Sequence, residues 1–303
     1  MKVLVTGGAG FVGTNLTLSL LEHGYEVKIF DDLSTGLKQN IPRNAQFINA
    51  SLLNTSKLNN AIKGCDVVVH LGARGSVPRS IKYPIATHDV NSSGTLNVLE
   101  AARSSGSHYI FSSSSSVYGS NMSLPKSEDM VLRPLTPYAA SKMSGEALSL
   151  AYAKSYELPV STFRFFNIFG PWQRPDHEYA AVLPKWISKC LKGDEIEVFG
   201  DGLQTRDFTY VGTVVNIILS CISKKILHPE PVNLAYGNNI SLNQVLELMK
   251  LNFPTLNVKY LPPRKGDVLH SKNDPKLIKT LYPDIALDKF EVSLQKTIDW
   301  FKN

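Results

Sequence analysis

Residues 2–13 of the chain read KVLVTGGAGFVG, and this stretch decides the fold. The run KVLVT is short, apolar and rich in β-branched residues, which predicts a buried strand. Glycines spaced three residues apart follow, and the run NLTLSLLEHG then predicts a helix that ends at Gly24. The next run, YEVKIFDD, predicts a second strand that closes on Asp31. The order is therefore strand, glycine turn, helix, strand and acid.

This order is typical of a site for a dinucleotide. Glycines let the backbone turn tightly and approach a pyrophosphate, while the N-terminus of the helix offers free N–H groups and a positive dipole end. Asp31 can accept both hydroxyls of a ribose, and its charge repels a 2′-phosphate, which favours NAD over NADP. A glycine-rich turn without a ligand is the alternative, but the strand, the helix and the acid all lie at matching distances.

Strand-like runs continue along the chain at residues 45–48, 65–71, 108–112 and 160–165. Helical patterns lie between them, for example at residues 91–104. Alternating strands and helices predict an α/β fold with a parallel, doubly wound, Rossmann-type sheet. The length of 303 residues allows two small domains or one large one.

The bulk composition narrows the classes of partner. Hydrophobic residues make up 43% of the chain and charged residues 19%, which is globular rather than disordered. The net charge of +6 would suit an anionic small molecule, but no basic stripe is interleaved with aromatics, so we expect no nucleic-acid partner. The longest apolar run is about half of a membrane span, and the first residues do not form a signal peptide, so we expect no membrane partner. Three scattered cysteines, without a Cys/His cluster, fit a reducing cytoplasm and indicate no metal site.

A tyrosine and a lysine point to proton chemistry. The run PYAASKMSGEALSLAYAKSY at residues 137–156 predicts a helix, on which Tyr138 and Lys142 share one face. A lysine ammonium near a phenol lowers the pKa of the phenol toward neutrality. The tyrosine could then take a proton from an alcohol while a hydride leaves the same carbon. On its own, this spacing is more often a surface tyrosine over a surface lysine.

Five consecutive serines occupy residues 112–116, directly after a predicted strand. A serine run by itself usually indicates a flexible linker. Here it belongs to a series of motifs that run in order from Thr6 to Ser271: TGGAGFVG, DDLSTG, HLGARGSVPRS, SSSSSVYG, YAASK, RFFNIFGPWQRP, GDGLQTRDF and PRKGDVLHS. This series resembles the extended short-chain dehydrogenase/reductase superfamily and, within it, the nucleotide-sugar 4-epimerases. The resemblance covers nearly the whole chain.

The resemblance implies a catalytic set. In the family pattern S-S-S/T-x-x-V-Y-G the third position is catalytic, and counting back from VYG places it at Ser114. Ser114 would hydrogen-bond the sugar 4-oxygen, and Tyr138 would take the proton of the 4-hydroxyl. The C4 hydride would move to bound NAD⁺ and return to the other face of a 4-keto sugar. Lys142 would also hold the nicotinamide ribose.

The resemblance also implies the cofactor contacts. Ser112 and Ser113 would hold the cofactor and the strand geometry, whereas Ser115 and Ser116 would only fill the loop. Ser51 stands where the family has an aspartate for the adenine amino group, and a glycine replaces the usual alanine in HLGAR. The implied cofactor-binding residues are Gly7, Gly10, Phe11, Val12, Gly13, Asp31, Asp32, Ser34, Thr35, Gly36, Ser51, Leu52, Leu71, Gly72, Ala73, Asn91, Ser112, Tyr138, Lys142 and Phe165.

A nucleotide-sugar site is the third implication. The diphosphate of a UDP-sugar suits the forked guanidinium of arginine, although Arg206 could instead pair with Asp207. The implied substrate-binding residues are Ser76, Arg79, Ser114, Asn167, Ala181, Val182, Phe199, Arg206, Arg264, Asp267 and Ser271.

The choice of sugar rests on small residues. The run YAAVLPKW resembles that of epimerases that prefer N-acetylated sugars, and Ser271 falls at a gatekeeper position where a small residue admits the N-acetyl group. We therefore expect a UDP-hexose 4-epimerase that accepts UDP-GlcNAc and UDP-GalNAc as well as, or in preference to, UDP-Glc and UDP-Gal.

A UDP-glucuronate 4-epimerase stays open because Arg174 could hold the carboxylate. A 4,6-dehydratase needs an acid pair where Ser115 and Ser116 stand, and a non-catalytic NAD sensor typically lacks the Tyr/Lys pair.

The resemblance finally implies an architecture and an assembly. An NAD-binding Rossmann domain would comprise residues 1–167 and 211–235, and a smaller α/β substrate-binding domain would comprise residues 168–210 and 236–303. A homodimer would form through the helices at residues 91–104 and 137–156, which would make a four-helix interface.

Overall fold

The computed structural model describes residues 1–176, 180–263 and 269–303. The chain divides into two compact units, each built from segments that are distant in the sequence. Unit 1 comprises Met1–Met122, Glu128–Phe165 and Val215–Asn233, and unit 2 comprises Ser123–Ser127, Phe166–Val214 and Leu234–Asn303.

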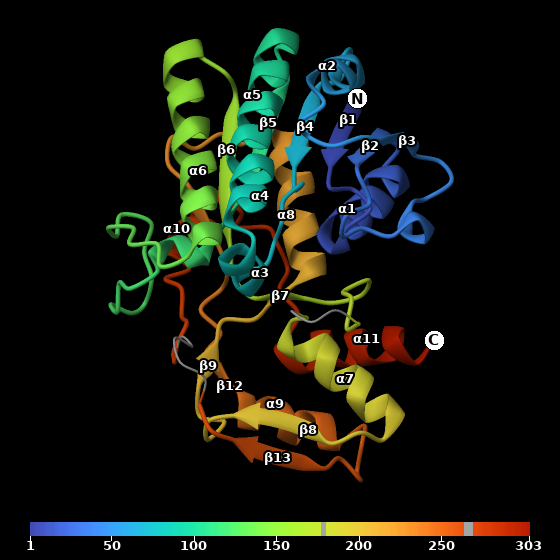
Figure 1. Ribbon diagram of the computed structural model, residues 1–303, viewed down its shortest axis with the longest axis vertical. Helices are drawn as coiled ribbons and strands as arrows, with labels where there is room; N and C mark the ends of the chain where they lie inside the picture. Colours follow the sequence, from blue (N-terminus) through green and yellow to red (C-terminus); the bar gives the residue numbers. More distant parts are fainter. Residues whose placement is uncertain (177–179, 264–268) are drawn as a thin grey trace. The chain divides into compact units, whose positions relative to one another are not determined.

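One sheet organises unit 1 (Figure 1). Among the described residues its seven strands lie in the order β11 (Val232–Leu234), β6 (Val160–Phe165), β5 (His108–Ser114), β4 (Val67–His70), β1 (Lys2–Thr6), β2 (Glu26–Asp31) and β3 (Gln46–Asn49). Every pairing from β3 to β6 is parallel. The strand order reverses between β1 and β4, and ligands of such sheets bind at the carboxyl ends of the strands near this point. The predicted α/β, doubly wound, Rossmann-type sheet is confirmed.

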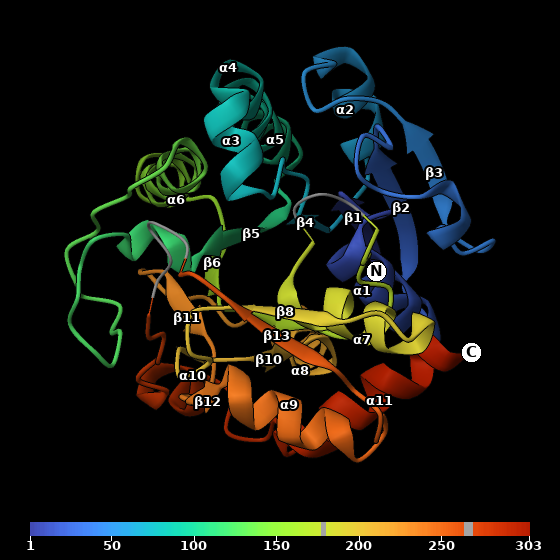
Figure 2. The same cartoon turned by 60° about the horizontal axis from the view of Figure 1, so that its bottom comes forward.

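Helices cover both faces of this sheet. They and the short turns are α1 (Phe11–Glu22), η1 (Lys38–Asn40), α2 (Thr55–Ile62), α3 (Val77–Lys82), α4 (Pro84–His88), the π-helical turn η2 (Asp89–Ser93), α5 (Gly94–Ser105), the 3-10 turn η3 (Ser115–Tyr118), α6 (Pro137–Tyr156) and, across the boundary with unit 2, α8 (Val211–Lys224). The helices α2, α5 and α6 share one buried cluster with Leu4 and Phe111 of the sheet. Helix α1 lies on the other face (Figure 2), toward which Val3 and Val5 point because strand side chains alternate.

Local sequence signals set the ends of these elements. The predicted helix at residues 137–156 is α6, with Pro137 in its first turn and the Thr136 hydroxyl accepting the Ala139 N–H at 3.2 Å. Helix α1 ends before Gly24, whose φ of +76° suits a residue without a side chain. The helix predicted at residues 91–104 is split, because the π-helical turn η2 precedes α5.

Unit 2 is a smaller α/β unit. Its described strands form three pairs, and its described elements are β7 (Ile168–Phe169), α7 (Val182–Lys192), β8 (Ile196–Phe199), β9 (Thr205–Arg206), β10 (Thr209–Tyr210), β12 (Ile240–Ser241), α9 (Leu242–Lys250), β13 (Val258–Leu261), α10 (Lys276–Leu281) and α11 (Phe290–Lys302). Its core packs Trp186 of α7 with Phe208, Leu246 and Ile298. Within the described ranges, no helix has the length and apolar character needed to cross a membrane.

Candidate functional site

The glycine turn between β1 and α1 is too tight for side chains. Gly7 has a φ of +69°, and its carbonyl accepts the Gly10 N–H at 3.1 Å. A Cβ on Gly13 would lie 2.2 Å from that carbonyl oxygen, and a Cβ on Gly7 would lie 2.7 Å from the backbone nitrogen of Gly72. No side chain caps α1 in the described structure, and its first turn carries no acid. The turn and the start of α1 therefore form a cradle whose backbone can approach an anion.

Asp31 lies at the end of β2 and is held in place by the backbone. Its Oδ2 accepts the Ala9 N–H at 3.0 Å, and its Oδ1 accepts the Leu33 N–H at 2.8 Å. The residue is 8% exposed, and burial raises the pKa of its carboxyl from the ordinary value. Each carboxylate oxygen has further acceptor capacity. Asp31 can therefore still accept ribose hydroxyls, and the cradle and the acid together fit an NAD molecule.

Asn91 clamps the loop that follows β4. It lies in the π-helical turn and is almost fully buried. Its Oδ1 accepts the Arg74 N–H at 2.7 Å, while its Nδ2 donates to the Arg74 carbonyl at 3.3 Å and to the Ser141 hydroxyl at 3.0 Å. Because both amide hydrogens are used within the protein, Asn91 can position this loop against α6.

The other predicted cofactor residues lie at or just beyond the carboxyl ends of the strands, and two of them have part of their capacity used locally or buried. The Ser51 hydroxyl accepts the Leu53 N–H at 3.3 Å, so part of its capacity is used locally. Leu52 is buried in the core beside α5, so only its backbone is available. The rest are placed as follows: Phe11 and Val12 in the first turn of α1, Asp32, Ser34, Thr35 and Gly36 after β2, Leu71, Gly72 and Ala73 after β4, Ser112 in β5, and Phe165 at the end of β6.

The serine run is ordered, so the flexible-linker alternative is wrong. Its first three serines end β5, and the last two begin the turn η3. Ser112 and Ser113 are buried. The Ser112 hydroxyl donates to the His70 carbonyl at 3.0 Å, and the Ser113 hydroxyl donates to Glu146 Oε2 at 2.8 Å. These contacts give both residues a part in holding β5 against its neighbours.

Ser114, Tyr138 and Lys142 come together at the end of β5. The Ser114 hydroxyl lies near the phenol of Tyr138 and acts to lower the pKa of that phenol. Lys142 is 5% exposed, and its Nζ donates to the Ser112 carbonyl at 2.7 Å and lies 5.1 Å from the centre of the Phe111 ring. Lys142 forms no ion pair with a described acid, and burial lowers the pKa of Lys142 to about 7.

The protonation of Tyr138 differs from the prediction. The sequence predicted that Lys142 lowers the pKa of Tyr138 toward neutrality. In this structure burial raises the pKa of the Tyr138 phenol above its ordinary value, and the Ser114 hydroxyl opposes that rise. Burial is the larger cause at both groups, because removal from water disfavours the charged form of each.

A buried ion pair lies behind these residues and was missed from the sequence. Arg164 of β6 donates from Nε to Glu146 Oε2 of α6 at 3.0 Å, and both side chains are 4% exposed. Arg164 Nη1 donates to the Tyr118 hydroxyl at 2.8 Å, and that hydroxyl donates to Asn233 Oδ1 at 2.7 Å. The pair thus contacts Ser113, which precedes Ser114, and Tyr118, which ends the turn after Ser114. Its sequence signal was one charge inside the apolar run VSTFRF and another inside the helix of residues 137–156.

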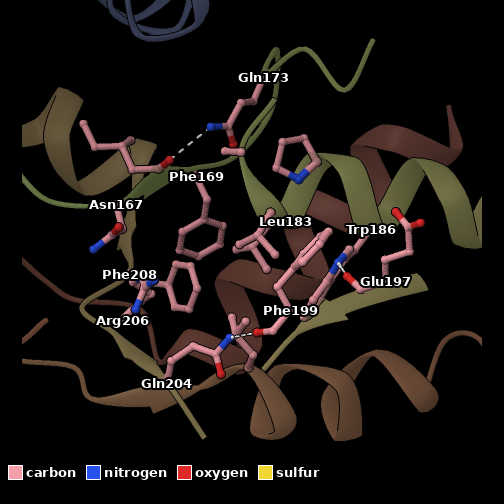
Figure 3. Close-up of a pocket in the computed structure, with 15 residues that line it drawn as sticks. Asn167, Phe169, Gln173, Leu183, Trp186, Glu197, Phe199, Gln204, Arg206 and Phe208 are labelled. Carbon is pink, nitrogen blue, oxygen red and sulfur yellow. Dashed lines mark hydrogen bonds between the residues drawn. The ribbon is translucent and has the colours of Figure 1, made fainter. Parts of the chain in front are cut away.

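Unit 2 contains a cavity of about 290 Å³ (Figure 3). Asn167 and Arg206 lie toward one end of it, and Trp186 and Glu197 toward the other. Five predicted substrate residues line it: Asn167, Ala181, Val182, Phe199 and Arg206. The lining also includes residues that the sequence did not single out, although most stand in or beside the quoted motifs: Phe169, Gln173, Trp186, Glu197, Gln204 and Phe208.

Arg206 of the cavity lining also bonds to the backbone, and the other predicted substrate residues have other surroundings. Arg206 Nη1 donates to the carbonyls of Thr205 at 2.9 Å and Leu269 at 3.4 Å. The Ser271 N–H donates to the Thr205 carbonyl at 3.2 Å, and Ser271 is not among the described residues that line the cavity. In unit 1 the Ser76 hydroxyl caps α3 by accepting the Arg79 N–H at 3.2 Å. The predictions for Arg264 and Asp267 lie outside the described residues.

Asp207, the alternative partner considered for Arg206, binds backbone N–H groups. Asp207 is fully buried, and its carboxylate accepts backbone N–H groups of Gly237 at 3.0 Å, Asn238 at 3.1 Å and Asn273 at 2.8 Å. Burial raises the pKa of this carboxyl to about 7. Asp207 therefore ties three segments of unit 2 together.

Comparison with known proteins identifies the family. The model described as the NAD dependent epimerase/dehydratase family matches residues 3–235. The chain belongs to this family. It is 36% identical, over 99% of its length and 98% of the relative, to a Methanocaldococcus jannaschii protein provisionally named UDP-glucose 4-epimerase. It is 31% identical, over 99% and 98%, to a UDP-N-acetyl-alpha-D-glucosaminuronate decarboxylase of Bacillus cytotoxicus.

Solved structures agree with the family assignment. The UDP-N-acetylglucosamine 4-epimerase from Methanobrevibacter ruminantium M1, in complex with UDP-N-acetylmuramic acid, superposes with a TM-score of 0.93 at 35% identity, covering 99% of this chain and 98% of that one. The Thermus thermophilus UDP-glucose 4-epimerase, in complex with NAD, superposes with a TM-score of 0.90 at 30% identity, covering 100% and 99%. The predicted family and its NAD dependence are confirmed. Because decarboxylases and a dehydratase are also relatives, membership leaves the reaction on the UDP-sugar open.

Proposed function

We propose that the protein is an NAD-dependent UDP-hexose 4-epimerase, which inverts C4 through a transient 4-keto sugar. The observation that carries the proposal is the meeting of Ser114, Tyr138 and Lys142 at the end of β5, with serines rather than acids directly after Ser114. One phenol and one hydroxyl suffice to move the proton of a secondary alcohol, whereas loss of water from the sugar needs a further acid and base.

Each residue has a role in this scheme. Bound NAD⁺ supplies the hydride acceptor and donor at C4. The glycine turn and the start of α1 would hold the pyrophosphate, and Asp31 would hold a ribose. Tyr138 as phenolate takes the proton from the 4-hydroxyl and later returns it. Lys142, whose pKa of about 7 lets it exchange protons at neutral pH, supplies positive charge beside the ribose and the phenolate.

The nucleotide part of the substrate is assigned to unit 2. We assign the diphosphate to Arg206, whose guanidinium lies at the edge of the cavity, and the nucleoside to the aromatic cavity lined by Phe199. The small residues Ala181 and Ser271 favour UDP-GlcNAc and UDP-GalNAc as substrates, as well as or in preference to UDP-Glc and UDP-Gal. A relative that is a UDP-N-acetylglucosamine 4-epimerase supports this choice. We further propose that the enzyme is a cytoplasmic homodimer formed through α5 and α6.

One observation weighs against a glucuronate substrate. The cation expected to bind the carboxylate is Arg174, and its Nε and Nη2 both donate to Asp176, each at 2.8 Å. This bidentate pair occupies the guanidinium edge that a uronate would need. The neutral and N-acetylated hexoses therefore remain favoured.

The experiment is turnover by the purified protein. UDP-GlcNAc, UDP-glucose, UDP-glucuronate and dTDP-glucose are supplied with NAD⁺, and products are read by NMR of the sugar ring. We expect the 4-epimer of UDP-GlcNAc, and we expect Tyr138→Phe to lose most turnover while still binding NAD. Epimerisation of UDP-glucose alone would remove the N-acetyl preference. A 4-keto-6-deoxy product, a pentose product or full activity of Tyr138→Phe would refute the proposal.

A further inference from the structure

Ser116 makes two hydrogen bonds to one atom. Its backbone N–H donates to Ser114 Oγ at 3.2 Å, and its hydroxyl donates to the same oxygen at 3.0 Å. The 3-10 turn that begins at Ser115 brings these two donors back onto the last residue of β5. The sequence had assigned Ser116 to loop filling, and the geometry contradicts that assignment.

The consequence follows from the capacity of a hydroxyl group. A serine oxygen has two acceptor lone pairs and one proton to donate. Both lone pairs of Ser114 Oγ are engaged by Ser116, so the hydroxyl of Ser114 has only its own proton left to share. A hydrogen bond from Ser114 to the nearby Tyr138 phenol is therefore one in which Ser114 donates and Tyr138 accepts.

We propose that Ser116 is a positioning residue that makes Ser114 a permanent donor toward Tyr138. A donor aimed at the phenol oxygen stabilises the phenolate more than the neutral phenol, because a hydrogen bond to a charged acceptor is stronger. Without the Ser116 hydroxyl, a lone pair of Ser114 becomes free, and the neutral phenol can donate to it instead. Ser116 thus selects the deprotonated form of Tyr138, which the proposed epimerase needs as its base, and in this respect the inference rests on the proposed function.

The neighbours of Ser116 do not share this role. Ser115 directly precedes it in the same turn and is similarly half-buried, but the structure shows no bond from its side chain to Ser114. The charged groups nearest in the hydrogen-bond network are Lys142, through Ser112, and Glu146, through Ser113. Replacing the Ser116 hydroxyl leaves these charged groups in place. Ser115→Ala removes a neighbouring hydroxyl that does not bond to Ser114, so it is a matched control.

The first test is a direct titration that needs no turnover. The pKa of Tyr138 is measured in Ser116→Ala, Ser115→Ala and the parent by ultraviolet difference titration, with Tyr138→Phe counterparts subtracted to isolate one phenol. In Ser116→Ala the Ser114 hydroxyl can still donate to the phenolate, but the neutral phenol gains an acceptor. One such hydrogen bond is worth up to about one pKa unit, so Ser116→Ala should raise the pKa of Tyr138 by up to that amount. Ser115→Ala should leave it unchanged, and Ser116→Thr, which keeps the hydroxyl, should restore the parent value.

The second test is the pH dependence of kcat with the substrate that is turned over. Ser116→Ala should move the acidic limb of kcat upward by the same shift, which is about a tenfold fall in kcat per unit on that limb, with KM for the UDP-sugar unchanged. A loss of kcat equal at every pH, or equal pKa values of Tyr138 in Ser116→Ala and Ser115→Ala, would overturn the inference. If the parent turns over none of the sugars, the proposed function fails, while the titration still decides the role of Ser116.

Discussion

The buried pair of Glu146 and Arg164 predicts a large and specific loss of stability. The perturbation is Glu146→Gln, which keeps the shape of the side chain and removes its charge. Arg164 then stays buried at 4% exposure without a counter-ion, and an amide nitrogen replaces one of the oxygens that accept from Arg164 and Ser113. Breaking a buried ion pair by removing one partner costs about 3–5 kcal/mol, so the free energy of unfolding of unit 1 should fall by about that amount.

Removing both charges should cost much less. In Glu146→Met combined with Arg164→Met, no buried charge is left unpaired, and the Tyr118 hydroxyl still has Asn233 as its acceptor. The Ser113 hydroxyl loses its acceptor, which costs about 1–3 kcal/mol. The double variant should therefore recover most of the loss seen in Glu146→Gln.

Urea unfolding of the cofactor-free protein provides the measurement. Far-ultraviolet circular dichroism follows both units, while tryptophan fluorescence follows unit 2, which contains all three tryptophans. The loss should appear in the dichroism transition and should change little with salt, because the pair is buried. The control is Glu26→Gln, which removes the exposed ion pair with Lys2 at 3.1 Å and should have little effect. A cost below about 1 kcal/mol for Glu146→Gln, or a double variant no more stable than the single one, would show that the pair does not carry this energy.

Three further predictions address the cofactor cradle, the substrate and the buried lysine. Gly13→Ala places a Cβ 2.2 Å from the Gly7 carbonyl oxygen, so NAD affinity measured by calorimetry should fall at least about tenfold. Gly24→Ala meets no neighbouring atom and, at a φ of +76°, should cost folding stability but keep the NAD affinity; equal affinities of the two variants would refute the cradle. Ser271→Tyr should suppress turnover of UDP-GlcNAc and spare UDP-galactose, and an equal response of both substrates would show that Ser271 is no gatekeeper. Lys142 has a pKa of about 7 in the folded protein, against 10.5 for a lysine in the unfolded chain. Its burial therefore lowers the free energy of unfolding by the full amount below pH 7, and this loss disappears as the pH rises toward 10.5. The cofactor-free Lys142→Met variant should thus exceed the parent in stability at pH 7 by a margin that shrinks by up to about 1.4 kcal/mol per pH unit toward pH 10; a margin independent of pH would contradict the lowered pKa.

Much of unit 1 could be predicted from short stretches of sequence. The run KVLVT forms β1 over the residues predicted, and the glycines after it fall where a side chain would strike the backbone. Tyr138 and Lys142 were predicted to share a face of α6 because the period of a helix brings residues four apart together. These features are local, because each depends only on residues a few positions apart in the chain.

The proton chemistry of the site could not be predicted in the same way. The direction of the Tyr138 pKa was mispredicted because proximity to Lys142 was considered and burial was not. Ser116 was taken for loop filler because no pattern shows that a 3-10 turn brings its two donors onto Ser114. The pKa of Tyr138 depends on how much water remains around its phenol, and the role of Ser116 depends on which donors surround the Ser114 oxygen.

By itself, the sequence determined the strand–turn–helix unit, its parallel sheet and the residue types available for NAD chemistry, because periodicity, glycine and capping act over a few residues. Only the tertiary structure decided that Arg164 lies opposite Ser113 and pairs with Glu146. It also decided which side chains that the sequence did not single out line the cavity of unit 2, namely Phe169, Gln173, Trp186, Glu197, Gln204 and Phe208. Such contacts join strands and helices far apart in the chain. Their energies come from burial and from charges removed from water, and neither exists until the chain has packed.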